Sequence, residues 1–151
     1  MRDMDSNTVV VEGVNPIVMT VAVGAKDTGN IDLQGFEGAL LVVHVGAKHA
    51  SDTLNSTNKI TILFQDAEDD GTGSPGSYAN VDTVDVVGVT PASGVVLTID
   101  DAAKCAMVHQ LGYVGDKRFI KATATPAGTI ANGVPIALEV IKGYPNYVPA
   151  S

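Results

Sequence analysis

Apolar and polar residues alternate along most of this chain with a period of two, in short runs separated by glycine, proline, aspartate and asparagine. Residues 118–125 give the clearest example. There, one set of positions can face a core while the set between them faces water, and the inward set is Ile120, Ala122 and Ala124. Such alternation is typical of a half-buried antiparallel β-strand.

The stretch 107–126 organises this pattern. A strand-like run at 106–113 and another at 118–125 are joined by Val-Gly-Asp-Lys at 114–117. Glycine and aspartate are residues that tight turns use. We therefore predict that the two runs form a β-hairpin.

Further strands are predicted at 8–12, 17–23, 38–45, 59–65, 81–89, 94–100 and 134–142, with a short edge strand at 31–33. We expect residues 13–16 to separate the first two strands, and residues 66–80 to form the longest irregular loop. The run 38–45 is nearly all apolar, as in a central strand with both faces covered. Three alternating sets are core candidates: Ile60, Ile62 and Phe64; Val95, Leu97 and Ile99; and Ile136, Leu138 and Val140.

No stretch has helical apolar spacing over three turns, although residues 101–105 fit one helical turn. Eight or nine short strands with turn signals between them predict an all-β fold, an antiparallel β-sandwich of the jelly-roll type. The 151 residues suit a single domain, 1–151, with a polar N-terminal arm at 1–7. Because Pro145 and Pro149 lie in the C-terminal tail at 143–151, we expect that tail to be extended.

Charge limits the classes of partner, and cysteine content limits the compartment in which the chain folds. The chain has 17 acidic and 9 basic residues, a net charge of −8, so we expect no nucleic acid and no membrane among its partners. The single cysteine, Cys105, excludes an intramolecular disulfide and fits folding in a reducing cytoplasm. The start of the sequence has no apolar signal segment, and we expect a soluble protein.

Candidate chemistry is sparse. The segment 66–71 resembles the opening of a calcium loop, but Ser77 stands where the bidentate glutamate belongs, so a solvated loop is favoured. The spacing of His44, His49 and His109 does not gather them on one element, and hydrogen-bonded roles are favoured over zinc ligation. Cys105 and Ser93 lack a nucleophile's surroundings. We therefore predict no enzyme activity, no cofactor and no metal.

The only local basic cluster consists of Lys117, Arg118 and Lys121. Two interpretations stay open for it. These residues either form a solvated turn that keeps a strand edge from pairing with other chains, or dock an acidic surface of a partner.

Several segments resemble a family of small proteins encoded beside the major capsid protein in tailed bacteriophages and prophages. They are Met-Arg-Asp-Met at 1–4, Gly-Phe-Glu-Gly at 35–38, Gly-Tyr-Val-Gly-Asp-Lys-Arg-Phe at 112–119 and Gly-Tyr-Pro at 143–145. The family usually has Gly-His-Pro followed by basic residues at the last of these, whereas this chain has Tyr144, Asn146 and Tyr147.

The resemblance implies a capsid decoration or cement protein, bound to the outer surface of the phage head and assembled in the bacterial host cytoplasm. Its partners would be the major capsid protein and further copies of itself, as a dimer or trimer. We expect the contacts to involve Arg2, Asp3, Met4, Lys117, Arg118, Tyr144 and Tyr147. The alternative is a neck, tail or receptor-binding virion component on the same sandwich, or a carbohydrate-binding one, although the chain has no Trp to stack on sugars.

Overall fold

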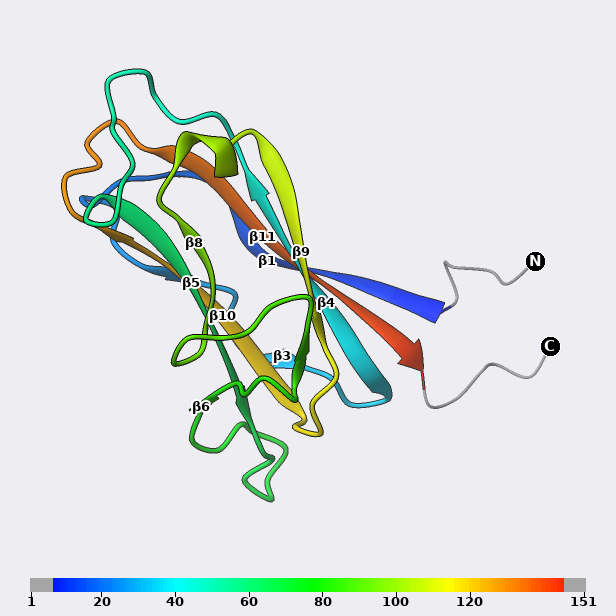
Figure 1. Ribbon diagram of the computed structural model, residues 1–151. Helices are drawn as coiled ribbons and strands as arrows, with labels where there is room; N and C mark the ends of the chain where they lie inside the picture. Colours follow the sequence, from blue (N-terminus) through cyan, green and yellow to red (C-terminus); the bar gives the residue numbers. More distant parts are fainter. Residues whose placement is uncertain (1–6, 146–151) are drawn as a thin grey trace.

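Two antiparallel sheets lie face to face in the computed structural model, which describes residues 7–145 (Figure 1). Sheet A has the strand order β1 (Thr8–Met19), β11 (Val134–Pro145), β4 (Phe36–Val45), β9 (Met107–Tyr113) and β7 (Val86–Val87). Sheet B has the order β2 (Lys26–Asp27), β10 (Phe119–Ala127), β5 (Lys59–Ala67) and β6 (Ala79–Asn80), with β3 (Ile31–Asp32) beside β10 and β8 (Val95–Ile99) beside β5. The predicted antiparallel β-sandwich is confirmed.

The core lies between the sheets and is built from the alternating positions of the long strands. Each of the three best-aligned predicted sets is buried, as follows: Ile60, Ile62 and Phe64 on β5; Ile120, Ala122 and Ala124 on β10; and Ile136, Leu138 and Val140 on β11. The single helical turn predicted at 101–105 is present as a 3-10 turn, Ala102–Lys104. Period-two alternation therefore identified the inward face of β5, β10 and β11.

The predicted hairpin at 107–126 is wrong. β9 pairs with β4 and β7 in sheet A, whereas β10 pairs with β5, β2 and β3 in sheet B, so the connection 114–118 crosses from one sheet to the other. The buried ring of Tyr113 explains why. It points into the space between the sheets, and the connection passes over it so closely that a Cβ on Gly115 would lie 2.5 Å from the phenol oxygen.

The predicted break at residues 13–16 is also wrong, because β1 continues from Thr8 to Met19. Two register shifts along its pairing with β11, between Glu12 and Val14 and between Val14 and Ile17, absorb the glycine and proline. Bulges of this kind allow proline in an edge strand, where one side of the backbone needs no partner. Residues 20–23, predicted as strand, form a turn instead.

Three smaller predictions need correction. On β8, Val96 and Ile99 are buried while Val95 and Leu97 are half-buried, because a register shift against β5 changes which positions face the core. Of the strand predicted at 81–89, only Val86–Val87 pairs, since residues 82–85 close a turn. The irregular loop predicted at 66–80 is shorter, with β5 running to Ala67 and β6 pairing on it.

The outer face of sheet A is apolar along one row that crosses all five strands. The register places these residues side by side: Val10 on β1, Ile141 on β11, Leu40 on β4, Gly112 on β9 and Val87 on β7. Val10 is 63% exposed and Val87 is 57% exposed. β4 is central, as predicted, but its outer face is only partly covered, because His44 is exposed there.

Candidate functional site

Three of the segments that carry the family resemblance meet at one end of sheet A. Strand pairing places Gly38 opposite Gly143 and Phe36 opposite Pro145, and it places Ala39 opposite Tyr113, where the connection 114–118 begins. We call this region, comprising residues 33–38, 113–118 and 143–145, the motif end. β1 begins there as well, because Thr8 pairs with Gly143 (Figure 1).

The buried side chain of Tyr113 holds the connection 114–118 in place from the core side. The Tyr113 hydroxyl donates a 3.0 Å hydrogen bond to the carboxylate of Asp66 on β5 and accepts one of 3.3 Å from the backbone N–H of Lys117. The N–H of Val114 also donates to the carbonyl of Asp85. The connection is therefore attached to both sheets rather than hanging free as a hairpin loop would.

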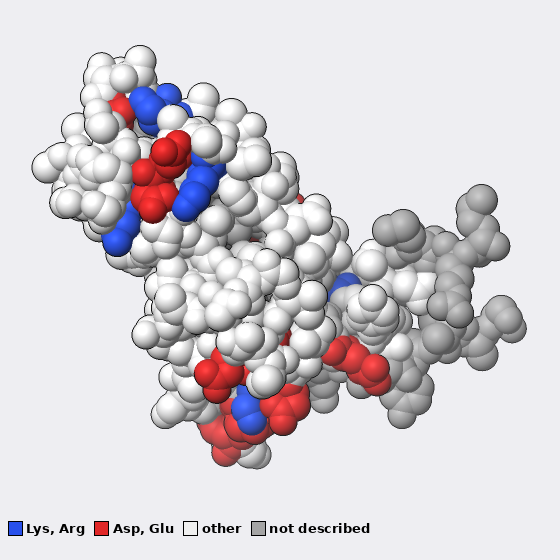
Figure 2. All heavy atoms as spheres, viewed as in Figure 1, with Lys and Arg blue, Asp and Glu red and all other residues white. Residues whose placement is uncertain are grey.

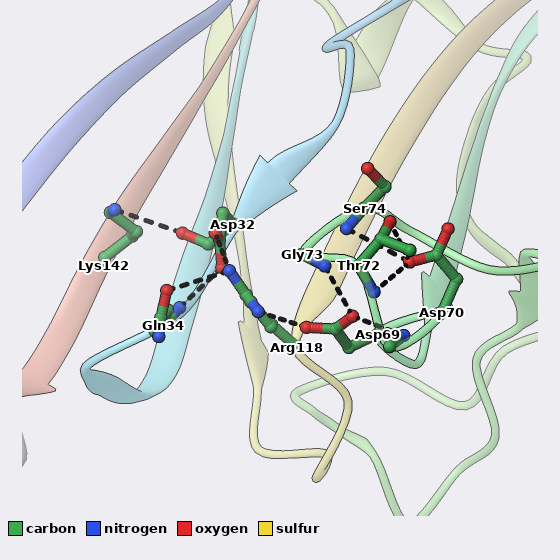
Figure 3. A network of polar contacts seen from close by, with 10 residues as sticks. Asp32, Gln34, Asp69, Asp70, Thr72, Gly73, Ser74, Arg118 and Lys142 are labelled. Atoms are coloured by element: carbon green, nitrogen blue, oxygen red, sulfur yellow. Dashed lines mark hydrogen bonds and ion pairs between the residues drawn. The ribbon is translucent and has the colours of Figure 1, made fainter.

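Arg118 links three separate segments through its guanidinium (Figure 3). Nε and Nη2 donate to the two carboxylate oxygens of Asp32 at 3.0 and 2.8 Å, and Nη2 also donates to the Gln34 side chain at 2.8 Å. Nη1 contacts the carboxylate of Asp69. The hydrogen bonds from Arg118 hold the pKa of Asp32 below its ordinary value, and Asp32 in turn raises the pKa of Arg118.

The acidic loop that follows β5 uses its carboxylates to hold its own backbone. Asp69 accepts hydrogen bonds from the N–H groups of Gly71 and Gly73, which lower its pKa. Asp70 accepts from the N–H and hydroxyl of Thr72 (Figure 3). Within residues 7–145 no three His, Cys, Asp or Glu side chains are placed so that together they could hold a metal ion. The solvated-loop interpretation is therefore the one that the hydrogen bonds support.

Lys117 lies beside the same acidic loop. Its ammonium group contacts Glu68 at 2.5 Å and Asp116 at 3.3 Å, and the hydrogen bond to Glu68 is the main reason that its pKa is raised. Lys117 and Arg118 thus have acidic partners within their own chain. The predicted docking of these two residues on a partner stays a prediction, and any partner would meet them already paired.

A shallow, open pocket of about 350 Å³ lies between the start of β4 and the connection. Its lining combines an aromatic ring, a carboxylate on each side and the two basic side chains, namely Phe36, Glu37, Asp116, Lys117 and Arg118. Lys142 covers the ring of Phe36, with its Nζ 4.8 Å from the ring centre, and donates to the Asp32 carbonyl. A pocket of this mixed character suits a polar protein segment better than an apolar small molecule.

Tyr144 is the most exposed large apolar side chain of the motif end. It is 79% exposed, and its φ of 56° lies in the left-handed region that non-glycine residues seldom adopt. The other predicted contact residues, Arg2, Asp3, Met4 and Tyr147, lie outside the described residues. Most of the predicted tail 143–151 and of the arm 1–7 is outside as well.

Charged side chains gather near two ends of the face seen in Figure 2, and the middle of that face carries few. One gathering is mainly acidic and lies where Figure 1 shows the loop between β5 and β6. The residues that give that loop its charge are Glu68, Asp69 and Asp70.

The remaining candidate residues lie apart from the motif end. His109 shares a 3.0 Å hydrogen bond with the carbonyl of Lys104, and the ring of His49 accepts from the N–H of Ser51. His44 lies 3.6 Å from Glu139 on the neighbouring strand. Cys105 is half-buried and burial raises its pKa, as expected for an unreactive thiol. Ser93 sits in the turn before β8 with a φ of 52°.

The sequence did not reveal the partners of Arg118, because Asp32 and Asp69 are 86 and 49 residues away.

No helix in the described part of the chain is long and apolar enough to cross a membrane. No family model, no curated protein and no solved structure matches this chain, so its resemblance to capsid decoration proteins remains a prediction from the sequence.

Proposed function

We propose that this protein is a structural virion protein that binds the outer surface of a tailed-phage head and stabilises contacts between major capsid subunits. The motif end is the proposed contact surface. The mechanism is mechanical, since a protein that binds across two subunits raises the free energy needed to separate them.

One observation carries this proposal. The segments 35–38, 112–119 and 143–145, which are far apart in the sequence, come together in space through the pairing of β4 with β9 and β11. If the resemblance reflected only the needs of a shared fold, the resembling residues would be spread throughout the core. Their concentration at one end, around an open pocket, supports a shared binding surface there.

The surroundings of that end also suit a clamp. The connection 114–118 is held by Tyr113 and Arg118, so a partner would meet a preorganised surface that costs little entropy to order. Tyr144 offers an exposed ring, and tyrosine is among the residues that dominate protein interfaces. A net charge of −8 suits a place on the outside of a particle, away from packaged DNA.

We also propose that the sandwich is of the jelly-roll type. The chain passes repeatedly from one sheet to the other, with β1, β4, β7, β9 and β11 in sheet A and β2, β3, β5, β6, β8 and β10 in sheet B. A jelly roll combines two such sheets from two Greek keys. An experimental structure with β9 and β10 side by side in one sheet would contradict this.

The capsid role is tested with heads of the virus that encodes this chain, prepared without the protein and then mixed with purified protein. We expect saturable binding, density on the outer surface by electron microscopy, and DNA release at a higher temperature. Tyr144→Asn removes the ring but tolerates the left-handed backbone, so it should weaken binding at least about tenfold. Val21→Ser, which changes an exposed apolar residue in the turn that follows β1, far from the motif end, is the matched control.

Three results would overturn the proposal. They are density inside the shell or along the tail, unchanged heat release of DNA from heads that lack the protein, and equal loss of binding by the Tyr144 and Val21 variants. Replacing Lys117 and Arg118 by glutamate is a less suitable test, because each would then face the carboxylates that it now binds. That change would disturb the fold as well as any interface.

A further inference from the structure

β1 is a long strand at an edge of a sheet, with β11 on one side. No strand within residues 7–145 pairs with its other side. At the remaining sheet margins, β2, β3, β6 and β7 have two residues each, and β8 has five residues and a register shift. Very short edge strands and bulges are the usual protection against pairing with other chains. The N-terminal half of β1 lacks that protection.

The residues of this half-strand favour pairing. Val9, Val10 and Val11 are β-branched and uncharged, and Val9 and Val10 are 43% and 63% exposed. Neither lysine nor proline interrupts the run. The second half of β1 differs, because Pro16 and two register shifts distort it, and Thr28 packs against Gly13. Only the first half therefore offers a straight, apolar edge.

We propose that this edge pairs antiparallel with the same edge of a second copy of the chain, about a two-fold axis at Val10. Val10 then lies opposite Val10 of the second copy, and Val9 lies opposite Val11. Such a contact is isologous, so it closes as a dimer and does not extend into a fibre. Two five-stranded sheets become one continuous sheet of ten strands.

The charges of β1 are compatible with this register. With the axis at Val10, the carboxylate of Glu12 falls opposite Thr8, and no two like charges face each other. An axis at Glu12 would place two carboxylates directly opposite, which is destabilising, and would require pairing along the distorted half of the strand. The Val10 axis therefore centres the contact on the three valines and opposes no like charges.

The outer apolar row gives the pairing a second source of stability. Val10 is the end of the row that runs through Ile141, Leu40, Gly112 and Val87. Because the two-fold axis is perpendicular to the sheet, the row of one copy continues into the row of the other. The dimer thus presents one apolar band twice as long as that of a single chain, on a single face.

The contact area is small, since one half-strand from each copy takes part, so we expect a weak dimer that depends on concentration. This inference does not depend on the capsid role. It is tested in solution without any particle, and its failure would leave the proposed function unaffected.

Sedimentation velocity over a range of concentrations should show the average mass rising from one chain, 15.5 kDa, toward twice that value. Val10→Lys places two ammonium groups opposite each other and should raise the dissociation constant at least about tenfold. Val108→Lys is the control, because Val108 is similarly exposed on the same sheet but lies on β9, away from the edge. It should leave the mass unchanged.

A cysteine placed at the proposed two-fold axis tests where the two copies touch. Opposed residues of an antiparallel pair have Cα atoms about 4.5 or 5.5 Å apart, within the range of about 4.4–6.8 Å for disulfides. In a Cys105→Ala background, Val10→Cys should give a covalent dimer on oxidation, and Val108→Cys should not. A single-chain mass at every concentration, a trimer, or equal cross-linking of the two variants would overturn the proposal. So would a wild-type monomer whose Val10→Lys variant loses binding to heads, because the edge would then pair with a capsid strand.

Discussion

The hydroxyl of Tyr113 donates a 3.0 Å hydrogen bond to the carboxylate of Asp66, joining the end of β9 in sheet A to β5 in sheet B. Both residues are buried. Burial is the main cause that raises the pKa of Asp66, the hydrogen bond from Tyr113 opposes it, and the nearby Asp85 adds to it. The pair therefore joins the two sheets with a carboxyl group that resists ionisation.

Asp66→Asn should make the protein more stable than the wild type as pH rises. A carboxyl whose pKa is raised in the folded state stabilises the fold fully below its unfolded value, near 3.8, and loses that contribution as pH rises through the folded pKa. Asparagine keeps an acceptor for Tyr113 but does not titrate. Urea denaturation at acidic and neutral pH measures the difference, and a constant gap between the two proteins would contradict the prediction.

Tyr113→Phe should act in the opposite direction. It leaves the Asp66 carboxyl buried without its phenol donor, which costs about 1–3 kcal/mol. It also removes the acceptor for the N–H of Lys117. We expect hydrogen exchange of that amide to accelerate more than exchange in β11, which reports only the loss of global stability.

Arg118→Lys should lower the melting temperature by several degrees, because an ammonium group cannot bind Asp32 through two parallel hydrogen bonds and reach Gln34 and Asp69 as well. Since the pKa of Asp32 is lowered in the fold, its contribution is present above its unfolded value and is lost in acid. The deficit of the variant should therefore be largest near neutral pH. Asp116→Asn, in the same connection, is the control, because the Asp116 side chain is 84% exposed.

Gly13→Ala should destabilise the fold by about 1–3 kcal/mol through overpacking. A Cβ at this position would lie 2.5 Å from the Thr28 methyl group and 3.0 Å from the Leu138 carbonyl oxygen. Thr28→Ser removes that methyl group and should recover part of the loss. Gly143→Ala is the matched control in the adjacent strand, because its Cβ would meet nothing within 4 Å. Equal effects of the two alanines in denaturant titrations would contradict the packing argument.

Asp52→Asn should loosen the turn before β11. Burial opposes ionisation of Asp52, but hydrogen bonds from the N–H groups of Gly133, Asn132 and Ala131 outweigh it and lower the pKa. An asparagine amide would present donors toward those donors. Hydrogen exchange at Gly133 should accelerate at neutral pH, and the difference from the wild type should narrow in acid, where Asp52 itself becomes protonated.

The sequence predicted the fold class and the best core positions because both depend on local alternation. Ile60, Ile62 and Phe64 face inward whichever strand lies beside β5, so their burial could be read without knowing the pairing. The hairpin prediction was wrong for the same reason, namely that it depended on local alternation alone. Alternation shows that one face of β9 and of β10 is buried, and a short connector with Gly and Asp suits a turn within one sheet or a crossing between two.

No pattern of neighbouring residues in the sequence indicated the ion pairs of the motif end. Arg118 and Asp32 are brought together only because β3 pairs with the start of β10, where Ile31 lies opposite Ile120 and Asp32 opposite Phe119. The bulge that buries Val96 in place of Leu97 was also beyond prediction, because a register shift depends on the partner strand.

The placement of β11 between β1 and β4 has a consequence for how this chain folds. Among the described strands β1 comes first in the chain, yet its partner comes from residues 134–145, so β1 cannot pair until nearly all of the sandwich has been synthesised. Pairing across such a sequence distance is slow, because a long loop must close before the contact stabilises it. Until then β1 and β4 both carry open edges, so the nascent chain is most prone to aggregation before β11 inserts.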